Sequence, residues 1–235
     1  MIGRAALFVT CLADTLYPSV GIATVTVLER LGVSVSFPRE QTCCGQMHFN
    51  SGYVDEARQL GQRFVDVFAG EPVVVTPSAS CAAHVRHQYA ELLGDDARGV
   101  PESVVELSQF VSGLGAVAIG ARFRGTVTYH PTCHSLRVLR VGDSPLRLLR
   151  EVEGLGLVEL PDADECCGFG GTFAVKNAAV SSAMLADKLD AIESTGADVV
   201  CACDSSCLMH IGGGLRRRGS RVRAVHLAEI LAGAS

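Results

Sequence analysis

The apolar positions of the chain follow two different spacings. Short apolar runs over 5–10, 33–37 and 72–77 have the length and the β-branched content of strands. Longer segments, over 15–31 and 51–69, place their apolar residues at helical spacing and end near a glycine. Strands that alternate with helices in this way predict a parallel α/β sheet with right-handed crossovers.

The second half of the chain repeats this alternation. Strands are expected over 125–130, 156–161, 198–203 and 222–225, with helices from Ser144, over 172–194, from Cys207 and from Leu227. Between the halves, 94–120 is interpreted as a linker made of a loop and one helix over 103–113. We therefore expect an α/β fold of two tandem, pseudo-symmetric parallel-sheet repeats, over 1–118 and 119–235.

Cysteines mark the points of each repeat where a strand ends and a helix begins. The doublet Cys43-Cys44-Gly45 returns as Cys166-Cys167-Gly168, and single cysteines flank both doublets. The matched sets are Cys11, Cys43, Cys44 and Cys81 in the first repeat, and Cys133, Cys166, Cys167 and Cys207 in the second. Each member follows its counterpart at a nearly constant interval, as expected of an internal duplication. Because the carboxyl ends of parallel strands share one edge of a sheet, each set is expected to gather at one site.

Composition narrows the chemistry of these cysteines. The chain has 235 residues, 10 cysteines and a formal charge of −5, and its opening apolar run is too short for a secretory signal. No segment reaches the roughly 18 apolar residues of a membrane span. We therefore expect a cytoplasmic protein without membrane insertion, where repeated cysteines bind metal or do redox chemistry more often than they form disulfides. Scattered arginines give no nucleic-acid stripe, and 216–218 is interpreted as a solvated helix end.

Four thiolates from separate loops suit a [4Fe–4S] cluster, so the chain is expected to hold up to two such clusters. Thiolate-ligated clusters are anionic, and helix N-termini would offer them amide donors and positive dipole ends. Glycine allows close approach of the backbone to a bulky inorganic core. The glycines expected to contact a cluster in this way are Gly45, Gly168, Gly170 and Gly171.

Two other kinds of site compete with a cluster. His130, His134 and His210 flank the predicted ligands, so a closed mixed cysteine–histidine zinc site with a structural role is an alternative. A thiol–disulfide enzyme that uses Cys43-Cys44 or Cys203 with Cys207 is a third interpretation, although adjacent cysteines form strained bridges. Cys201 lies within a predicted strand and is assigned to the core, whereas Cys203 is either a spare ligand or a bystander.

Taken together, these motifs resemble the cysteine-rich CCG domains of heterodisulfide reductase and of the iron–sulfur subunits of glycolate oxidase and anaerobic glycerol-3-phosphate dehydrogenase. They most closely resemble the lactate utilization protein A family. The resemblance covers essentially the whole chain and is most specific over 77–83, 160–173 and 207–213. It implies a cytoplasmic iron–sulfur electron-transfer subunit of a system that oxidises L-lactate to pyruvate. Such a subunit would not itself bind substrate and would work with iron–sulfur and accessory partner proteins.

The chain departs from the fuller family pattern at one position of each repeat. That pattern ends each repeat in Cys-x-x-Cys, and in heterodisulfide reductase five cysteines per repeat hold an unusual cluster. Here the additional position is Ser78 in the first repeat and Asp204 in the second. The departure favours a site with four thiolates and weakens the interpretation as a heterodisulfide-type, thiol/disulfide enzyme. Asp204 is expected to support the site as a neighbour of the ligands rather than as an oxygen ligand.

Overall fold

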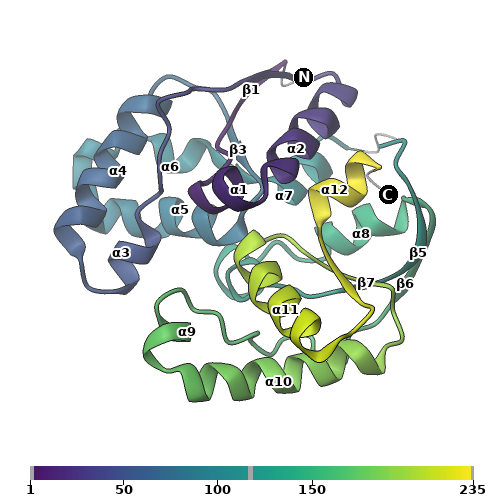
Figure 1. The fold of residues 1–235 in the computed structure, drawn as a ribbon. Helices are drawn as coiled ribbons and strands as arrows, with labels where there is room; N and C mark the ends of the chain where they lie inside the picture. The colour runs from purple at the N-terminus through teal and green to yellow at the C-terminus, as the bar shows by residue number, and fades with distance from the viewer. Residues whose placement is uncertain (1–2, 116–118, 234–235) are drawn as a thin grey trace. The chain divides into compact units, whose positions relative to one another are not determined.

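The computed structural model describes residues 3–115 and 119–233, which form two compact units, Met1–Val117 and Ala118–Ser235. Each unit contains its own four-stranded parallel sheet, with the strand order β2-β1-β3-β4 in the first unit and β6-β5-β7-β8 in the second (Figure 1). The predicted α/β fold of two parallel-sheet repeats is therefore confirmed. The predicted boundary between 118 and 119 stays a prediction, because residues 116–118 lie outside the described residues.

The first unit alternates strands and helices along its whole length. Its elements are β1 (Arg4–Leu7), α1 (Cys11–Leu16), α2 (Pro18–Arg30), β2 (Ser34–Ser36), α3 (Gln46–Asn50), α4 (Val54–Phe68), β3 (Val74–Thr76), α5 (Ala79–Leu93), the 3₁₀ turn Gly94–Ala97, α6 (Val100–Ser103), β4 (Val104–Glu106) and α7 (Leu107–Gly113). In Figure 1, α4 and α5 lie on one side of β1 and β3, and α2 and α7 lie on the other. This two-sided cover explains why the central strands are buried on both faces.

The second unit has the same order of strands and a similar alternation of strands with helices. Its elements are β5 (Arg122–Tyr129), the π-helical turn His134–Leu139, α8 (Ser144–Arg150), β6 (Glu153–Val158), α9 (Phe173–Lys176), α10 (Ala178–Ser194), β7 (Val199–Ala202), α11 (Ser205–Arg218), β8 (Arg223–His226) and α12 (Leu227–Ala232). The helix expected from Ser144 is α8, but its N-cap is Asp143 rather than Ser144, and a proline lies in its first turn, where the missing N–H costs no helical hydrogen bond. The strands β5 and β7 pair in parallel through Val127 with Val199 and Tyr129 with Cys201.

The interpretation of 94–120 as a linker was wrong. This segment contributes β4, which pairs with β3 through Val104 and Val74, and α7, whose N-terminus is capped by the side chain of Glu106. The strand has only three residues, too few to show an alternating pattern. In the second unit, the corresponding elements are β8 and α12, and both were predicted from the sequence. The duplication therefore indicated that a strand and a helix should also end the first unit.

Three predicted helices differ from the structure: two are interrupted and one begins later. The predicted helix over 15–31 is split at Tyr17, because Pro18 starts a new helix. The segment 51–69 begins its helix only at Val54, and 172–194 is divided at Asn177 into α9 and α10. A short helix thus follows each cysteine–cysteine–glycine doublet, and each doublet lies within the loop that joins a strand to that helix.

Each unit has a core that lies next to its predicted cysteines. In the first unit Phe8 packs edge-on against Phe64 with ring centroids 4.8 Å apart, and Tyr89 donates a hydrogen bond from its hydroxyl to the Cys44 carbonyl at 2.9 Å. In the second unit buried Cys167 packs within a cluster that includes Ile211. Among the described helices, none combines the length and apolar character that crossing a bilayer requires.

Candidate metal centres

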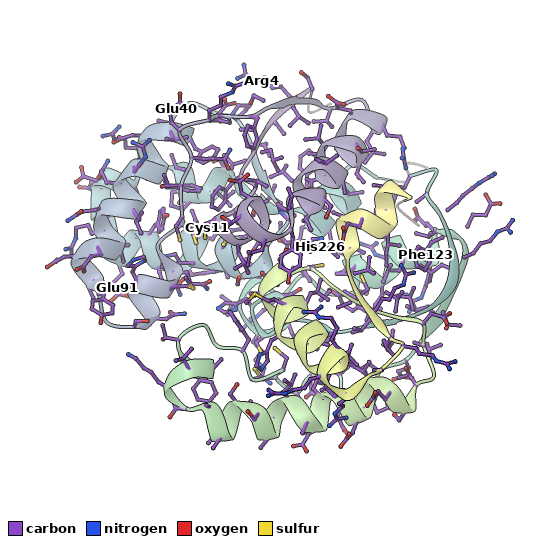
Figure 2. All side chains as sticks on the ribbon, viewed as in Figure 1. Arg4, Cys11, Glu40, Glu91, Phe123 and His226 are labelled. Atoms are coloured by element: carbon purple, nitrogen blue, oxygen red, sulfur yellow. The ribbon has the colours of Figure 1, made fainter. Side chains whose placement is uncertain are left out.

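Three loops of the first unit deliver its predicted cysteines to one edge of the sheet. Cys11 begins α1 just after β1, Cys43 and Cys44 precede α3, and Cys81 lies in the first turn of α5. Because β1 pairs in parallel with both β2 and β3, these loops share the carboxyl edge of the sheet. Figure 2 shows Cys11 at this place with further sulfur atoms beside it.

The thiols of the first unit perturb one another's protonation. Hydrogen bonding with Cys11, and then with Cys44, lowers the pKa of Cys43 to about 2. The N–H of Gly45 also donates to Cys43 Sγ at 3.4 Å. The hydrogen bond to Cys43 is the largest cause that raises the pKa of Cys11 and of Cys44, and Cys81 adds to the rise at Cys44. The four thiols thus form one interacting group in which a single thiolate is stabilised.

The second unit repeats this arrangement. Hydrogen bonding with Cys133, and then with Cys167, lowers the pKa of Cys166 to about 2, and the Gly168 N–H donates to Cys166 Sγ at 3.3 Å. The hydrogen bond to Cys166 is in turn the largest cause that raises the pKa of Cys133 and of Cys167. Cys207, in the first turn of α11, also raises the pKa of Cys167. Each predicted quartet is therefore brought together, while its role in binding metal stays a prediction.

The remaining two cysteines lie outside the quartets. Cys201 is fully buried in β7, which confirms its assignment to the core, and burial raises the pKa of its thiol. Cys203 is also buried, and its Sγ lies 3.3 Å from the hydroxyl of Tyr129. All ten cysteines are free thiols. No disulfide among these described cysteines therefore competes with metal for the two quartets.

Glycines shape both doublets. Gly45 and Gly168 adopt left-handed backbones with φ of 85° and 86°, and this conformation presents their N–H groups to the first sulfur of each doublet. Gly170 and Gly171 also have positive φ. Their carbonyls accept hydrogen bonds from the first residues of α9. The two glycines therefore form the turn that leads into α9. Contact of any of the four glycines with a bound group stays a prediction.

The positions where the fuller family pattern has an additional cysteine hold helix N-caps. Ser78 caps α5 and accepts a hydrogen bond from the backbone N–H of Cys81 at 3.2 Å. Asp204 stands at the N-cap of α11, where Thr132 donates to its carboxylate at 3.0 Å. The Ser78 side chain therefore caps the helix that carries Cys81, and the Asp204 side chain links the start of α11 to Thr132. A supporting role for Asp204 beside the ligands stays a prediction.

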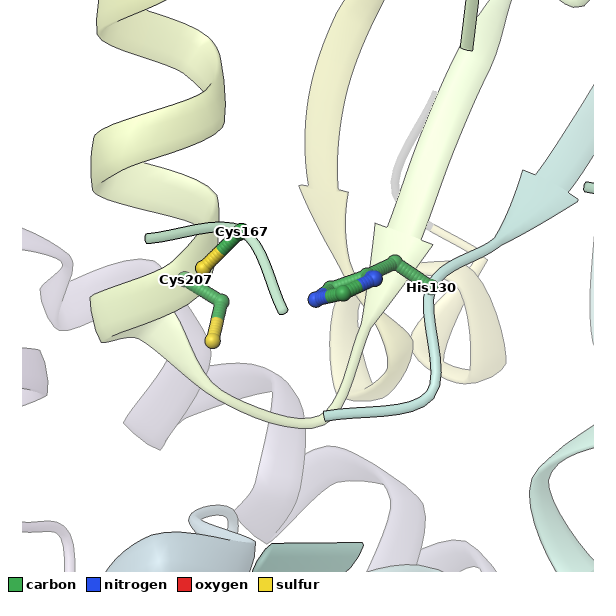
Figure 3. Close-up of side chains that lie close together, drawn as sticks. All are labelled: His130, Cys167 and Cys207. Atoms are coloured by element: carbon green, nitrogen blue, oxygen red, sulfur yellow. The ribbon is translucent and has the colours of Figure 1, made fainter. Parts of the chain in front are cut away.

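A histidine joins the thiols of the second unit. His130 follows β5 and is fully buried, and its ligand atom lies within 4.8 Å of those of Cys167 and Cys207 (Figure 3). Burial lowers the pKa of His130 to about 4, helped by the charge of Lys188, so the ring is neutral near pH 7. The sequence marked this histidine only as one of three that flank ligands. Side-chain packing decides which of the three histidines faces the sulfur atoms, and the spacing of residues in the sequence does not determine that packing.

Lys188 was not anticipated from the sequence. It lies on α10 with 1% of its surface exposed, and its Nζ donates to the carbonyl of Asp162 at 2.6 Å. Burial lowers the pKa of its ammonium group, while the nearby carboxylate of Glu165 and the thiol of Cys167 oppose that shift. This hydrogen bond ties α10 to the loop that leads into Cys166. The only signal in the sequence was a lysine at a helical spacing that otherwise carries Leu185, Leu189 and Ile192.

The donor sets fit a thiophilic metal centre. Each unit supplies sulfur atoms from three loops, a backbone N–H aimed at one of them and a helix N-terminus nearby. Soft thiolates select iron–sulfur clusters, zinc or copper(I) over magnesium and calcium. A bound metal would displace the remaining thiol protons. Its positive charge would then balance the negative charge of several thiolates held close together. The clustered cysteines therefore indicate metal binding.

The chain matches the family model described as the cysteine-rich domain CCG over residues 5–86 and 127–212, and these ranges contain both quartets. Lactate utilization protein A from Geobacillus kaustophilus is 47% identical over 234 residues, which cover 97% of this chain and 98% of that protein. The protein of the same name from Halalkalibacterium halodurans is 45% identical over 235 residues, which cover 97% and 96% respectively. Among solved structures, glutamate racemase isoform RacE1 from Bacillus anthracis aligns with a TM-score of 0.33 and 13% identity, over 97% of this chain and 78% of that chain.

Proposed function

The chain belongs to the lactate utilization protein A family, and from this premise we propose that it is the iron–sulfur electron-transfer subunit of a system that oxidises L-lactate to pyruvate. Its role in lactate utilization follows from the family, and the electron-transfer role is the step we add. The single observation that carries this step is that each unit gathers a quartet of free thiols at one sheet edge. Each quartet is proposed to hold one [4Fe–4S] cluster.

The residues of each unit have distinct tasks in this proposal. The thiolates would hold the cluster, namely Cys11, Cys43, Cys44 and Cys81 in the first unit and Cys133, Cys166, Cys167 and Cys207 in the second. Gly45 and Gly168 donate N–H groups to sulfur, which stabilises negative charge on the ligands. When bound, the two clusters supply one-electron redox chemistry, which matches the pair of electrons that L-lactate gives up together with two protons.

Partners are part of this proposal. No convincing constellation for binding a 2-hydroxy acid stands out in the sequence, so the chain would receive electrons from a protein that oxidises the substrate and deliver them to an acceptor. We expect these partners to be iron–sulfur and accessory proteins of the same lactate-utilization system. A cytoplasmic location is proposed because free thiols at this density persist in a reducing compartment.

One observation favours a second candidate for one unit. The group formed by His130, Cys167 and Cys207 has the donor types and the close spacing of a zinc site. A structural zinc ion there would make the chain a scaffold for the same assembly. Among the described residues of the first unit, no such group of cysteine and histidine donors is found. With zinc in the second unit, only the quartet of the first unit would then hold a cluster.

The pathway is tested by removing the gene from a host without a second copy and comparing growth on two carbon sources. The deletion strain is expected to grow on pyruvate but to fail on L-lactate, because only the oxidation of lactate needs this electron carrier. Restoring the intact gene should restore growth on L-lactate. Unimpaired growth of the deletion strain on L-lactate would contradict the proposed function.

A further inference from the structure

His130 is a buried polar side chain whose partners are missing. Its backbone N–H donates to the Cys201 carbonyl at 2.8 Å, which fixes the residue at the carboxyl edge of the second sheet. Its side chain is fully buried, and neither ring nitrogen has a hydrogen-bond partner within the described part of the chain. Buried polar atoms nearly always have partners in native proteins, so an imidazole left without one calls for an explanation.

The ring is aimed at the sulfur atoms of the second quartet. Figure 3 shows the far end of the His130 ring, which carries Nε2, directed at Cys167 and Cys207. The ligand atoms of the three residues lie within 4.8 Å of one another. Donors around one metal ion, at about 2.0 Å for nitrogen and 2.3 Å for sulfur, lie roughly 3.5 to 4 Å apart. Around a single ion, a small inward shift would bring the three atoms onto a common metal, whereas on a cluster each atom would bind a separate iron.

The first unit has no counterpart of this imidazole. Counted from the matched cysteines Cys11 and Cys133, the position of His130 is occupied by Phe8. Phe8 is fully buried and packs on Phe64 and Phe68 with ring centroids 4.8 and 5.8 Å away. The same place in the duplicated fold is thus apolar and well packed in one unit, and polar and unpartnered in the other.

We propose that His130 is a metal ligand of the second unit through Nε2, in place of one of the four thiolates, so that the two centres of the chain are unequal. The first centre would have cysteine donors only, and the second would combine cysteine with histidine. This inference rests on the proposed function only in requiring that the second unit binds a metal; it holds for an iron–sulfur cluster and for zinc.

An imidazole ligand would change how the second centre accepts electrons. A neutral imidazole brings no negative charge to the metal, whereas a thiolate does. Replacement of cysteine by histidine in iron–sulfur centres raises the reduction potential. The second centre is therefore expected to be reduced before the first when the protein is titrated with a reductant. Converting His130 to Phe, the residue of the first unit, should reduce or abolish that difference.

The ligand is identified by pulsed electron paramagnetic resonance of the full chain, labelled with ¹⁵N-histidine and purified anaerobically. Cys44→Ser is introduced to empty the first unit, so that the signal of the reduced protein comes from the second. A strong ¹⁵N coupling, typical of a directly bonded nitrogen, is expected. It should be lost in His130→Phe and kept in His210→Phe, because His210 Nε2 is instead 3.4 Å from the hydroxyl of Ser181. A loaded second unit with only the weak couplings of remote nitrogens would overturn the inference.

The metal found in the second unit separates this inference from the proposed function. If that unit contains zinc without sulfide, the proposal of a cluster in the second unit is wrong. X-ray absorption at the zinc edge then tests whether His130 is a ligand. A shell with one nitrogen at about 2.0 Å beside sulfur at about 2.3 Å still supports His130, whereas a sulfur-only shell overturns it. A second unit that holds no metal overturns both the His130 inference and the cluster proposed for that unit. Because the protein with His130 intact gives the decisive signal, a poorly folding His130 variant does not weaken the test.

Discussion

Replacing Cys167 with serine is expected to remove the metal of the second unit and to leave the first unit loaded. Cys167 is the buried hub of its quartet, because it interacts with both Cys166 and Cys207 and lies near His130. A serine hydroxyl is a hard donor that keeps its proton near pH 7, so it substitutes poorly for a thiolate. Metal and sulfide per chain, measured after anaerobic purification, should fall to about half of the wild-type values.

Matched variants make this prediction specific. Cys44→Ser should have the mirror effect on the first unit, and the double variant should lose both centres. Cys201→Ser is the control, because Cys201 is equally buried but lies in β7 outside the quartet. It should retain full metal content even where stability falls. If Cys201→Ser and Cys167→Ser lost metal to the same extent, the loss would reflect unfolding rather than ligand removal.

Gly168→Ala is expected to lower the free energy of unfolding of the second unit by roughly 3 kcal/mol. Gly168 has φ of 86°, a conformation that costs an L-residue about 1–2 kcal/mol. A Cβ at this position would also lie 2.6 Å from the backbone carbonyl oxygen of Ser181, which α10 holds in place. Backbone cannot move aside as a flexible side chain would, so the doublet turn must shift. Chemical denaturation of the metal-free protein measures the change.

Two other glycines calibrate this effect. Gly196 has φ of 66° with open space around the added Cβ, so Gly196→Ala should cost only the conformational energy, about 1 kcal/mol. Gly45→Ala should fall between the two, because its Cβ would lie 3.1 Å from the carbonyl of Ala57. Equal losses for Gly168→Ala and Gly196→Ala would show that the close approach to Ser181 does not matter.

The meeting of the thiols could be predicted from the sequence because it depends on topology. Parallel strands place all their carboxyl ends at one edge, so a cysteine after each strand is enough to predict that the thiols meet. The doublets reinforced this through Gly45 and Gly168, whose left-handed backbones are available to few other residues. Most strands and helices were likewise predictable from their apolar runs, including β8 and α12 at the end of the chain.

What the sequence did not reveal depends on packing. The three-residue strand β4 carries no period and is recognised only by analogy with β8. His130 and Phe8 occupy matched positions with opposite character, and only the three-dimensional arrangement shows that the imidazole faces sulfur. Lys188 is buried because its Nζ reaches the Asp162 carbonyl, a contact between residues far apart in the sequence. Such contacts follow from side-chain rotamers rather than from residue spacing.

The most direct test of the account is the content of iron and acid-labile sulfide in the anaerobically purified protein. Each loaded unit is expected to contribute about four iron and four sulfide, since that is the composition of a [4Fe–4S] cluster. A protein with both units filled would therefore hold about eight of each per chain. Zinc without sulfide in both units, or thiols that bind no metal, would contradict the electron-transfer role.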